Sequence, residues 1–332
     1  MKQKIFSLFV GLLATVAIQA QQIAVVSGGG ATSVYQTLAD AIEGAAPGST
    51  IYLPGGGFQI SDDVKIEKML SIIGIGHKAV SENADGNTVI SGNLFFNEGS
   101  SNSAIMGCYI SGNINVGNDG SSVNNILIKY CNLNAVEVQN NTCTGTMVSQ
   151  NYIRGISHFN EASCLFTNNI AHSTYNLDGG TIVNNIFTGY YGSYSYYVYQ
   201  WTDGYAMAFC DNCSIKNNVI LDWANNPCNG SNNNTTGNMA KGRFGDDPIN
   251  MGDIDWNNVF VNYNNRTISP ASNFHFKCEY QQYEDEVGIY GGTEPFNDSA
   301  LPPVPYIVSK VIPEQTDASG KLNIKIRVKA GE

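Results

Sequence analysis

The six-residue word LFTNNI at residues 165–170 returns as TIVNNI at 181–186 and as SIKNNV at 214–219. Four further segments share its pattern: IMGCYI at 105–110, IKYCNL at 128–133, VSQNYI at 148–153 and IDWNNV at 254–259. In this alignment the fourth position is a cysteine or an asparagine, and the sixth position is always apolar. The chain therefore contains an internal repeat, and such a repeat decides the architecture.

The spacing of the repeat indicates its structure. Successive fourth positions are separated by 23, 20, 17, 16, 33 and 40 residues. The shorter spacings fit one coil of a β-solenoid, which consists of three short strands joined by turns, and the two longer ones fit a coil with an insertion. Such strands cannot bury an apolar face alone, so stacked coils must supply the core. We predict roughly ten coils, with the sixth position pointing inward.

The repeated asparagine also has a structural explanation. Equivalent side chains of stacked coils lie about 4.8 Å apart, so amides in one column can donate to and accept from each other. Asparagine additionally tolerates the left-handed turn conformation. We therefore predict one buried column that begins with two free thiols and continues with amides: Cys108, Cys131, Asn151, Asn168, Asn184, Asn217 and Asn257.

The two ends of the repeat region carry different patterns. Segment 33–46 places its apolar residues on one helical face, and Ser33 with Gln36 predicts a capping-box helix that covers the first coil. Residues 21–300, including this helix, are expected to form the solenoid domain. The Pro-rich segment 301–332 contains KLNIKIRVKA, in which apolar and mainly basic residues alternate. This alternation predicts a half-buried strand whose cations protect an edge from further pairing.

The start of the 332-residue chain, MKQKIFSLFVGLLATVAIQAQQ, has the layout of a secretory signal peptide over residues 1–20. No later segment has the roughly 20 apolar residues of a transmembrane helix, so we expect no integral membrane segment. The net charge of −11, with only 17 Lys and Arg, argues against nucleic acid as a partner. We expect an exported protein, either secreted or periplasmic, with association to the cell surface as a further option.

Three parts of the chain resemble a known group of proteins. LADAIEGAAPGSTIYLPGG at 38–56, the NN coils, and DEVGIYGGTEPFNDSALPPVPYI at 285–307 resemble the start, middle and end of secreted proteins of the pectin-lyase-like superfamily. The resemblance implies an all-β, right-handed parallel β-helix and, most often, carbohydrate as the ligand class. The WIDH and R-x-P-x-x-R words of pectate lyases are missing, as are the NTD, GHG and RIK words of polygalacturonase-like hydrolases. No active-site residue is therefore carried over.

Departures from the regular coil length are candidate functional sites. The insertion after TIVNNIF contains GYYGSYSYYVYQWTDGY, and a second insertion runs from residue 222 to about 253. Because aromatic rings stack on sugar faces, these insertions predict a polysaccharide- or glycan-binding face formed by Tyr190, Tyr194, Tyr197, Tyr199, Trp201, Trp223 and Arg243. The alternative is that the rings cover an outward apolar stripe of the coils at Phe187, Ile220 and Phe260.

A catalytic function would need other residues. A lyase requires a base and a cation beside the substrate carboxylate, for which Arg154 and Lys216 are candidates, with His158 nearby in sequence. A hydrolase requires two carboxylates, for which Asp246 and Asp247 are candidates, and these could instead bind calcium. Two hypotheses remain: a polysaccharide-binding or surface structural protein, and a polysaccharide lyase or glycoside hydrolase. The missing signature words favour the first.

Overall fold

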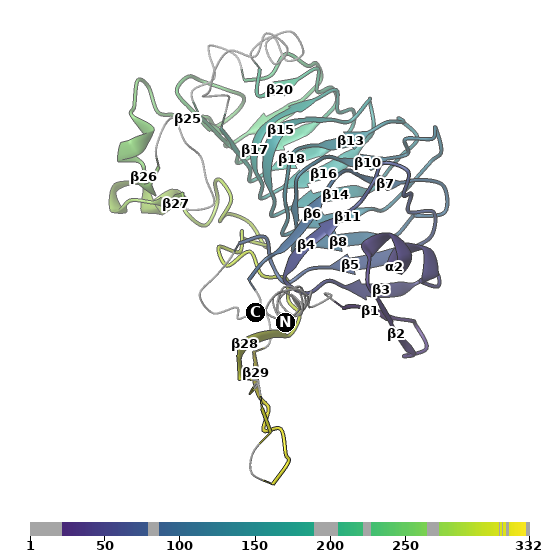
Figure 1. Cartoon of the computed structure of the whole chain (residues 1–332). Helices are drawn as coiled ribbons and strands as arrows, with labels where there is room; N and C mark the ends of the chain where they lie inside the picture. The colour runs from purple at the N-terminus through teal and green to yellow at the C-terminus, as the bar shows by residue number, and fades with distance from the viewer. Residues whose placement is uncertain are drawn as a thin grey trace, which may run out of the picture.

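The computed structural model describes residues 22–78, 86–188, 205–221, 227–263, 272–311, 313, 315–316 and 319–329. The predicted signal peptide lies outside these ranges. The fold is all-β, with 40% strand and 6% helix, and forms a parallel β-solenoid of about eight turns (Figure 1). The predicted fold class is confirmed, with eight turns in place of ten. None of the described helices is long and apolar enough to cross a membrane.

A small N-terminal unit closes the first turn of the solenoid. β1 (Ile23–Val26) pairs antiparallel with β2 (Thr32–Tyr35) on one side and with β3 (Ser49–Tyr52) on the other. The helix α2 (Leu38–Gly44) lies against β1 and β2 and buries its apolar face. The open end of the first coil is therefore covered by both a hairpin and a helix.

The capping helix is shorter than the predicted segment 33–46. Its N-cap is Thr37, whose hydroxyl accepts a hydrogen bond of 3.1 Å from Asp40 N. The predicted capping box at Ser33 and Gln36 is wrong, because TSVY at 32–35 is rich in β-branched and aromatic residues and forms β2 instead.

Each turn contributes one strand to a first sheet, which is parallel from β3 onward. The middle residue of most of these strands is fully buried, as at Ile128 and Phe166, so this sheet forms one wall of the core. In spatial order after β3, its strands are β5 (Leu70–Ile73), β8 (Ala104–Met106), β11 (Leu127–Lys129), β14 (Thr146–Ser149), β16 (Cys164–Thr167), β18 (Thr181–Val183), β21 (Ser214–Lys216) and β23 (Asn234–Thr236).

A second sheet supplies the other two faces of each turn. Its longer face contains β4 (Gly56–Gln59), β6 (Thr88–Ser91), β9 (Tyr109–Ile110), β12 (Asn132–Leu133), β15 (Tyr152–His158), β17 (Ile170–Tyr175), β19 (Ile186–Phe187), β22 (Val219–Ile220), β24 (Met239–Ala240) and β25 (Ile249–Asn250). The third face contains the second halves of β15 and β17 together with β7 (Leu94–Phe96), β10 (Ile114–Val116), β13 (Val136–Val138) and β20 (Met207–Ala208).

The repeated asparagines form a buried column, but its members differ from those predicted. Asn151, Asn169, Asn185 and Asn218 each donate from Nδ2 to Oδ1 of the next amide, over 3.1, 3.1, 2.9 and 3.0 Å, and the last acceptor is Asn238. The free thiols Cys108 and Cys131 lie in the turns before Asn151, and Cys131 N donates to Asn151 Oδ1. We call this column the inner ladder.

The inner ladder uses the second asparagine of each NN pair. The first one, at Asn168, Asn184 and Asn217, has a left-handed φ of 52°, 55° and 54°. The predicted alignment is therefore wrong by one residue from Asn168 onward, because the ladder role and the turn role belong to two neighbours. Asn257 belongs to neither set and lies in the 3-10 helix η1 (Trp256–Asn258).

This shift also exchanges the inward and outward sides of the later strands. Ala171 pairs with Ile153 on one side and with Phe187 on the other, and all three pack inside the solenoid. The sixth positions of the later repeats instead join a separate apolar cluster outside the coils, so the predicted outward stripe at Phe187, Ile220 and Phe260 is wrong. The true stripe consists of Tyr152, Ile170, Ile186, Val219 and Met239.

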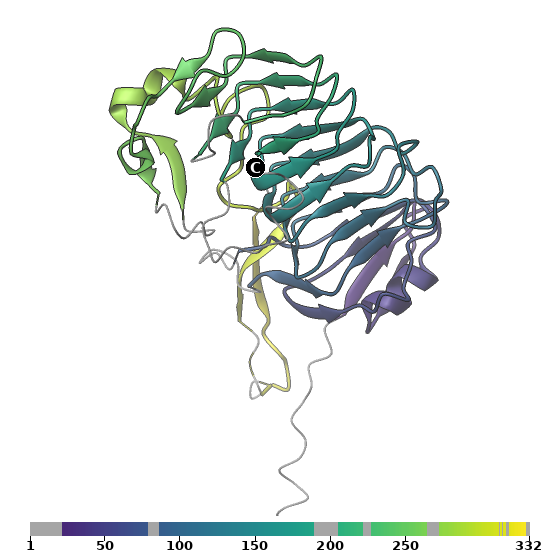
Figure 2. The ribbon, with the colours of Figure 1, turned by 90° about the horizontal axis from the view of Figure 1, so that it is seen from above.

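A C-terminal segment covers this outer stripe. It comprises η1, β26 (Phe260–Asn262), β27 (Asn273–Phe276) and the 3-10 helix η2 (Cys278–Tyr283), which we call the cap (Figure 2). Trp256 and Phe260 are fully buried and stack with ring centroids 6.0 Å apart. The described chain thus covers the stripe with its C-terminal part, where the sequence had suggested the insertions.

Residues 285–304 form a strap that runs back along one corner of the solenoid. The left-handed asparagines of that corner hold its backbone: Asn184 Nδ2 donates to Glu286 O (2.6 Å), and Asn168 Nδ2 donates to Ile289 O and Gly291 O (both 2.9 Å). The start of the strap thus contacts later turns of the solenoid than its end does.

The strap ends against the early turns. Gln150 Oε1 accepts a hydrogen bond from Asn297 N (3.0 Å), and Lys129 forms an ion pair of 2.7 Å with Glu294. At Gly107, where φ is +68°, an added Cβ would lie 2.7 Å from Pro302, so only glycine fits beneath the strap.

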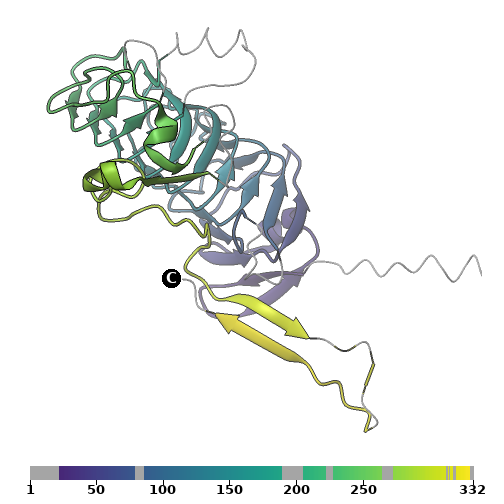
Figure 3. The same ribbon diagram turned by 90° about the vertical axis from the view of Figure 1, so that its left-hand side faces the viewer.

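The chain ends in an antiparallel hairpin of β28 (Tyr306–Val311) and β29 (Lys325–Lys329), which projects away from the solenoid (Figures 1 and 3). The predicted terminal strand is therefore present. It does not protect a solenoid edge, and it is not half-buried, because all five residues of β29 are exposed.

Candidate functional site

The third face of the solenoid carries a straight outward column of functional side chains. Ladder pairing joins Phe95 to Asn115, Asn115 to Glu137, Glu137 to His158 and His158 to Tyr175. Their strand neighbours, such as Ile114 and Val136, point inward and are fully buried, which forces the column outward. The ladder partner of Tyr175 in the next turn is the buried Ala208, and the residue after it, Phe209, contacts the Tyr175 ring. We call Phe95, Asn115, Glu137, His158, Tyr175 and Phe209 the outer column.

Side chains of the outer column contact each other from one turn to the next. His158 Nδ1 lies 3.9 Å from Glu137 Oε2, and the His158 and Tyr175 rings meet edge to face at 4.8 Å. The Tyr175 ring in turn meets Phe209 at 5.4 Å, and Phe209 is 41% exposed. An imidazole and a carboxylate thus lie in the middle of the column, with aromatic rings at its end.

Burial shifts the two titratable groups in the middle of the column. It raises the pKa of Glu137 to about 7, because the charged carboxylate loses solvation. It lowers the pKa of His158 for the same reason, since the imidazolium also loses solvation. Near neutral pH, an uncharged imidazole therefore lies beside a carboxyl group that is partly protonated.

A row of exposed amides runs beside the outer column, at the corner where the third face begins. Asn134 Nδ2 donates to Asn113 Oδ1 (2.7 Å), Asn113 N donates to Asn93 Oδ1 (2.8 Å), and Asn93 Nδ2 donates to Asp62 Oδ1 (3.0 Å). This amide row keeps part of its hydrogen-bonding capacity directed to solvent, because an amide side chain has two donors and two acceptor lone pairs.

Most of the predicted glycan-binding residues lie outside the described ranges. This applies to Tyr190, Tyr194, Tyr197, Tyr199, Trp201 and Trp223. Of that set, Arg243 is described, and it is exposed in the turn between β24 and β25. The first insertion connects β19 to β20, and Phe209 at the end of the outer column follows β20 directly.

The two cations proposed for lyase chemistry do not meet. Arg154 is outward on β15, where its guanidinium donates to Asn132 Oδ1 (2.8 Å), Ile110 O (3.0 Å) and Ser111 O (3.3 Å). It also lies 4.7 Å from the ring centroid of Tyr109, so it ties neighbouring turns together. Lys216 is on β21 in the first sheet, on a different face.

The carboxylates proposed for hydrolysis or calcium binding lie at the last turn. Asp246 and Asp247 are exposed, and Asp247 has a left-handed φ of 47°. Within the described ranges, no group of three or more His, Cys, Asp and Glu side chains is arranged to hold a metal ion. Both residues lie in the turn between β24 and β25, where Asp246 forms an isolated β-bridge with Thr236.

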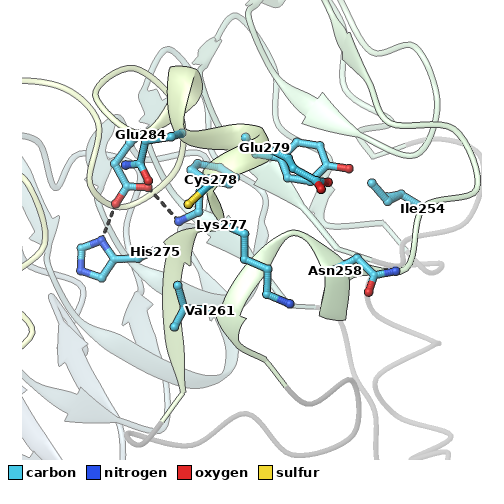
Figure 4. A pocket seen from close by; sticks show the side chains of 11 residues that line it. Ile254, Asn258, Val261, His275, Lys277, Cys278, Glu279 and Glu284 are labelled. Carbon is cyan, nitrogen blue, oxygen red and sulfur yellow. Dashed lines mark hydrogen bonds and ion pairs between the residues drawn. The ribbon is translucent and has the colours of Figure 1, made fainter.

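A second polar cluster lies on the cap, beside an open hollow of about 940 Å³ (Figure 4). His275 contacts Glu284 through Nδ1 and Asp298 through Nε2, the latter at 3.0 Å, and its ring stacks on Tyr290 with centroids 3.8 Å apart. Because both imidazole nitrogens are engaged by carboxylates, His275 links the cap to the strap and lacks a nitrogen for a substrate.

Sequence reasoning missed Glu137, Asn115 and Tyr175 as site residues. One signal was available: from Asn115 to Glu137, His158 and Tyr175 the steps are 22, 21 and 17 residues, close to the coil spacings. A search for titratable groups at the coil period would have placed these residues on one face. In comparisons with known proteins, no family model, curated protein or solved structure matched the chain.

Proposed function

We propose that this β-helix protein is exported and binds a polysaccharide, whose chain would lie along the solenoid axis over the outer column. The proposal rests on one observation: aromatic and hydrogen-bonding side chains occupy the same outward position on successive turns. It agrees with the resemblance to pectin-lyase-like proteins, whose usual ligands are carbohydrates.

The chemistry of the column suits a sugar chain. Rings such as Tyr175 and Phe209 offer apolar faces for the C–H groups of a sugar, and the phenol adds a hydroxyl at small entropic cost. Glu137 and the neighbouring amide row can hydrogen-bond to sugar hydroxyls, whereas Asn115 is buried and donates to Leu94 O (3.3 Å). Turns are about 4.8 Å apart, so a linear polymer parallel to the axis would meet a new side chain at each turn.

A binding experiment tests this proposal. We expect the protein to bind one or more members of a panel of neutral and uronate polysaccharides in isothermal titration calorimetry. Tyr175→Ala and Phe209→Ala should each weaken binding about tenfold, which corresponds to about 1.4 kcal/mol. Tyr52→Ala is the matched control, because Tyr52 is 40% exposed on the first sheet. Equal affinity of all four proteins, or no binding across the panel, would refute the proposal.

The pKa of Glu137 favours a second candidate function, a polysaccharide lyase or glycoside hydrolase. A carboxylic acid with a pKa of about 7 can donate a proton near neutral pH, and the adjacent imidazole can accept one. A hydrolase would need a second carboxylate roughly 5 to 9.5 Å away, and the outer column itself contains only Glu137. Binding therefore remains the first proposal.

Product assays test the second candidate. New reducing ends would reveal hydrolysis, and absorbance from unsaturated ends would reveal elimination. If Glu137 acts as the acid, activity should fall above about pH 7, where its carboxyl loses the proton. Glu137→Gln should abolish turnover and leave polysaccharide binding within about twofold. Retention of turnover by Glu137→Gln would exclude Glu137 as the acid.

A further inference from the structure

The terminal hairpin exposes two chemically different faces. Along β29 the apolar residues Ile326 and Val328, both 57% exposed, alternate with Lys325 and Arg327. Ile324 continues the apolar side and is 50% exposed. An isolated two-stranded hairpin is marginally stable in water. Within the described structure, the apolar side of this hairpin remains exposed to solvent.

The cap offers a surface of matching chemistry. The open hollow of about 940 Å³ is lined by Ile254, Val261 and the ring of Tyr280, and by the carboxylates of Glu279 and Glu284 (Figure 4). Two cationic side chains also line it, but Lys277 donates to Asn257 O and His275 contacts Glu284. Val261 is 52% exposed, so this part of β26 is itself an uncovered apolar surface. Such a hollow could accept aliphatic side chains in its centre and cations at its rim.

The hairpin and the hollow lie at opposite ends of the same molecule. The cap packs on the late strands, where Trp256 and Phe260 share a cluster with Val219 and Met239. The strap carries the chain back to the early turns, and the hairpin projects beyond them (Figures 1 and 3). A hairpin cannot therefore fill the hollow of its own chain in this structure.

We propose that the hairpin of one copy docks in the cap hollow of a second copy. Aliphatic residues of β29 would fill the apolar part of the hollow, and Lys325 or Arg327 would face Glu279 and neighbouring carboxylates. Because the two contacting surfaces are different, the contact is head-to-tail, and it can repeat from copy to copy into an open chain or a closed ring.

Charge complementarity favours a second copy as the occupant. Residues 305–329 carry 5 Lys and Arg against 2 Asp and Glu, whereas residues 22–304 carry 10 against 25. The region that includes the hollow, 241–294, has 4 cations against 9 carboxylates. The basic hairpin is thus attracted to the acidic end of another molecule, and the acidic body is repelled by an anionic membrane.

Sedimentation velocity over a concentration series tests the proposal. The wild-type protein should form dimers and longer species as concentration rises, and high salt should weaken them. Ile326→Asp should abolish this association, and so should Val261→Asp on the opposite surface. Arg327→Glu should weaken it about tenfold. Lys216→Glu, which places the same charge change on the first sheet, is the control and should associate like wild type.

A mixing experiment separates this contact from the alternatives. Ile326→Asp keeps an intact hollow and Val261→Asp keeps an intact hairpin, so an equimolar mixture should form 1:1 dimers and no longer species. If Val261→Asp still associates alone, the hairpins pair with each other, and the proposal is wrong. It is equally wrong if wild type stays monomeric at all concentrations while its hairpin binds vesicles of anionic lipid. Unchanged melting temperatures of both variants would exclude misfolding as the cause of any loss.

Discussion

The two asparagines of each NN pair lie on opposite sides of one corner of the solenoid. Inside, Asn185 donates from Nδ2 to Phe166 O (2.8 Å) and to Asn218 Oδ1 (2.9 Å), and both partners belong to neighbouring turns. Outside, Asn184 donates to Glu286 O of the strap. The same side chain thus stabilises the repeat in one position and holds a non-repeating segment in the next. Position relative to the corner, and not residue type, decides the role.

The largest loss of stability is expected for a substitution in the inner ladder, on the inner side of the corner. Asn185→Ala removes the side-chain oxygen that accepts from both Asn169 N and Asn169 Nδ2. Asn169 Nδ2 keeps its bond to Val148 O, whereas the buried Asn169 N loses its hydrogen-bond partner. We expect the free energy of unfolding to fall by about 3 kcal/mol, because each unpaired buried group costs roughly 1–3 kcal/mol. Urea unfolding followed by circular dichroism measures this loss.

Asn140→Ala is the matched control for the inner ladder. Asn140 is a half-exposed amide at another corner, which donates to Gly120 O over 2.7 Å and accepts from Thr142 N over 3.0 Å. Its loss should change the unfolding free energy by about 0.5 kcal/mol. Similar losses for the two variants would show that burial of the ladder adds nothing to its strength.

A smaller loss of stability is expected for a substitution of Asn184, on the outer side of the corner. Asn184→Ala should cost about 1–2 kcal/mol, because alanine is strained at a φ of 55° and the bond to the strap is lost. Asn184→Gly removes the same bond without that strain, so its cost should be lower by the same unfolding measurement. An alanine variant as stable as the glycine variant would contradict a role for backbone conformation.

The attachment of the strap, on the outer side of the corner, should weaken as pH rises through the pKa of His275. Burial lowers the pKa of His275, but its hydrogen bonds to Glu284 and Asp298 outweigh burial and raise the pKa above 6.5. Because the folded state holds this proton more tightly, the stabilisation is complete below pH 6.5 and is lost as pH rises through the raised value. Proteolytic cleavage within residues 285–304 should therefore become faster across that range.

His275→Gln is the control for this pH dependence. The side chain keeps a polar group but cannot carry the proton, so cleavage of the strap should follow only the pH profile of the protease. The amides of the inner ladder do not titrate, so the hydrogen bonds of the ladder should not share this pH dependence. A pH dependence that persists in His275→Gln would assign it to other groups, such as Lys78, whose Nζ donates to Asp298 O.

The repeat made the fold predictable, but it did not determine the register of the later turns. In most half-exposed strands, apolar and polar residues alternate and identify the inward side. Here both Ile186 and Phe187 are apolar, because the cap buries one and the solenoid buries the other. Asn184 and Asn185 precede them and are also identical in type. The sequence therefore does not show which asparagine, or which of the two apolar residues, points inward.

The candidate site was harder to predict from the sequence than the fold was. The sequence singled out insertions for their aromatic content, and it named His158 only as a neighbour of Arg154. Glu137 carries no local motif, and its importance comes from ladder pairing with His158 one turn later. The exposed state of β29 was also unpredictable, because alternation looks the same on an edge strand and on a projecting hairpin.

The direction of the strap has a consequence for how the molecule unfolds. In an ordinary repeat protein each turn contacts only its neighbours, so terminal turns can fray while the middle persists. Here one continuous segment contacts Asn217 near the last turn and Gly107 near the first ones. Releasing any turn from the stack therefore strains contacts along the whole corner. We therefore expect the strap to make the solenoid unfold as one cooperative unit, close to two-state behaviour.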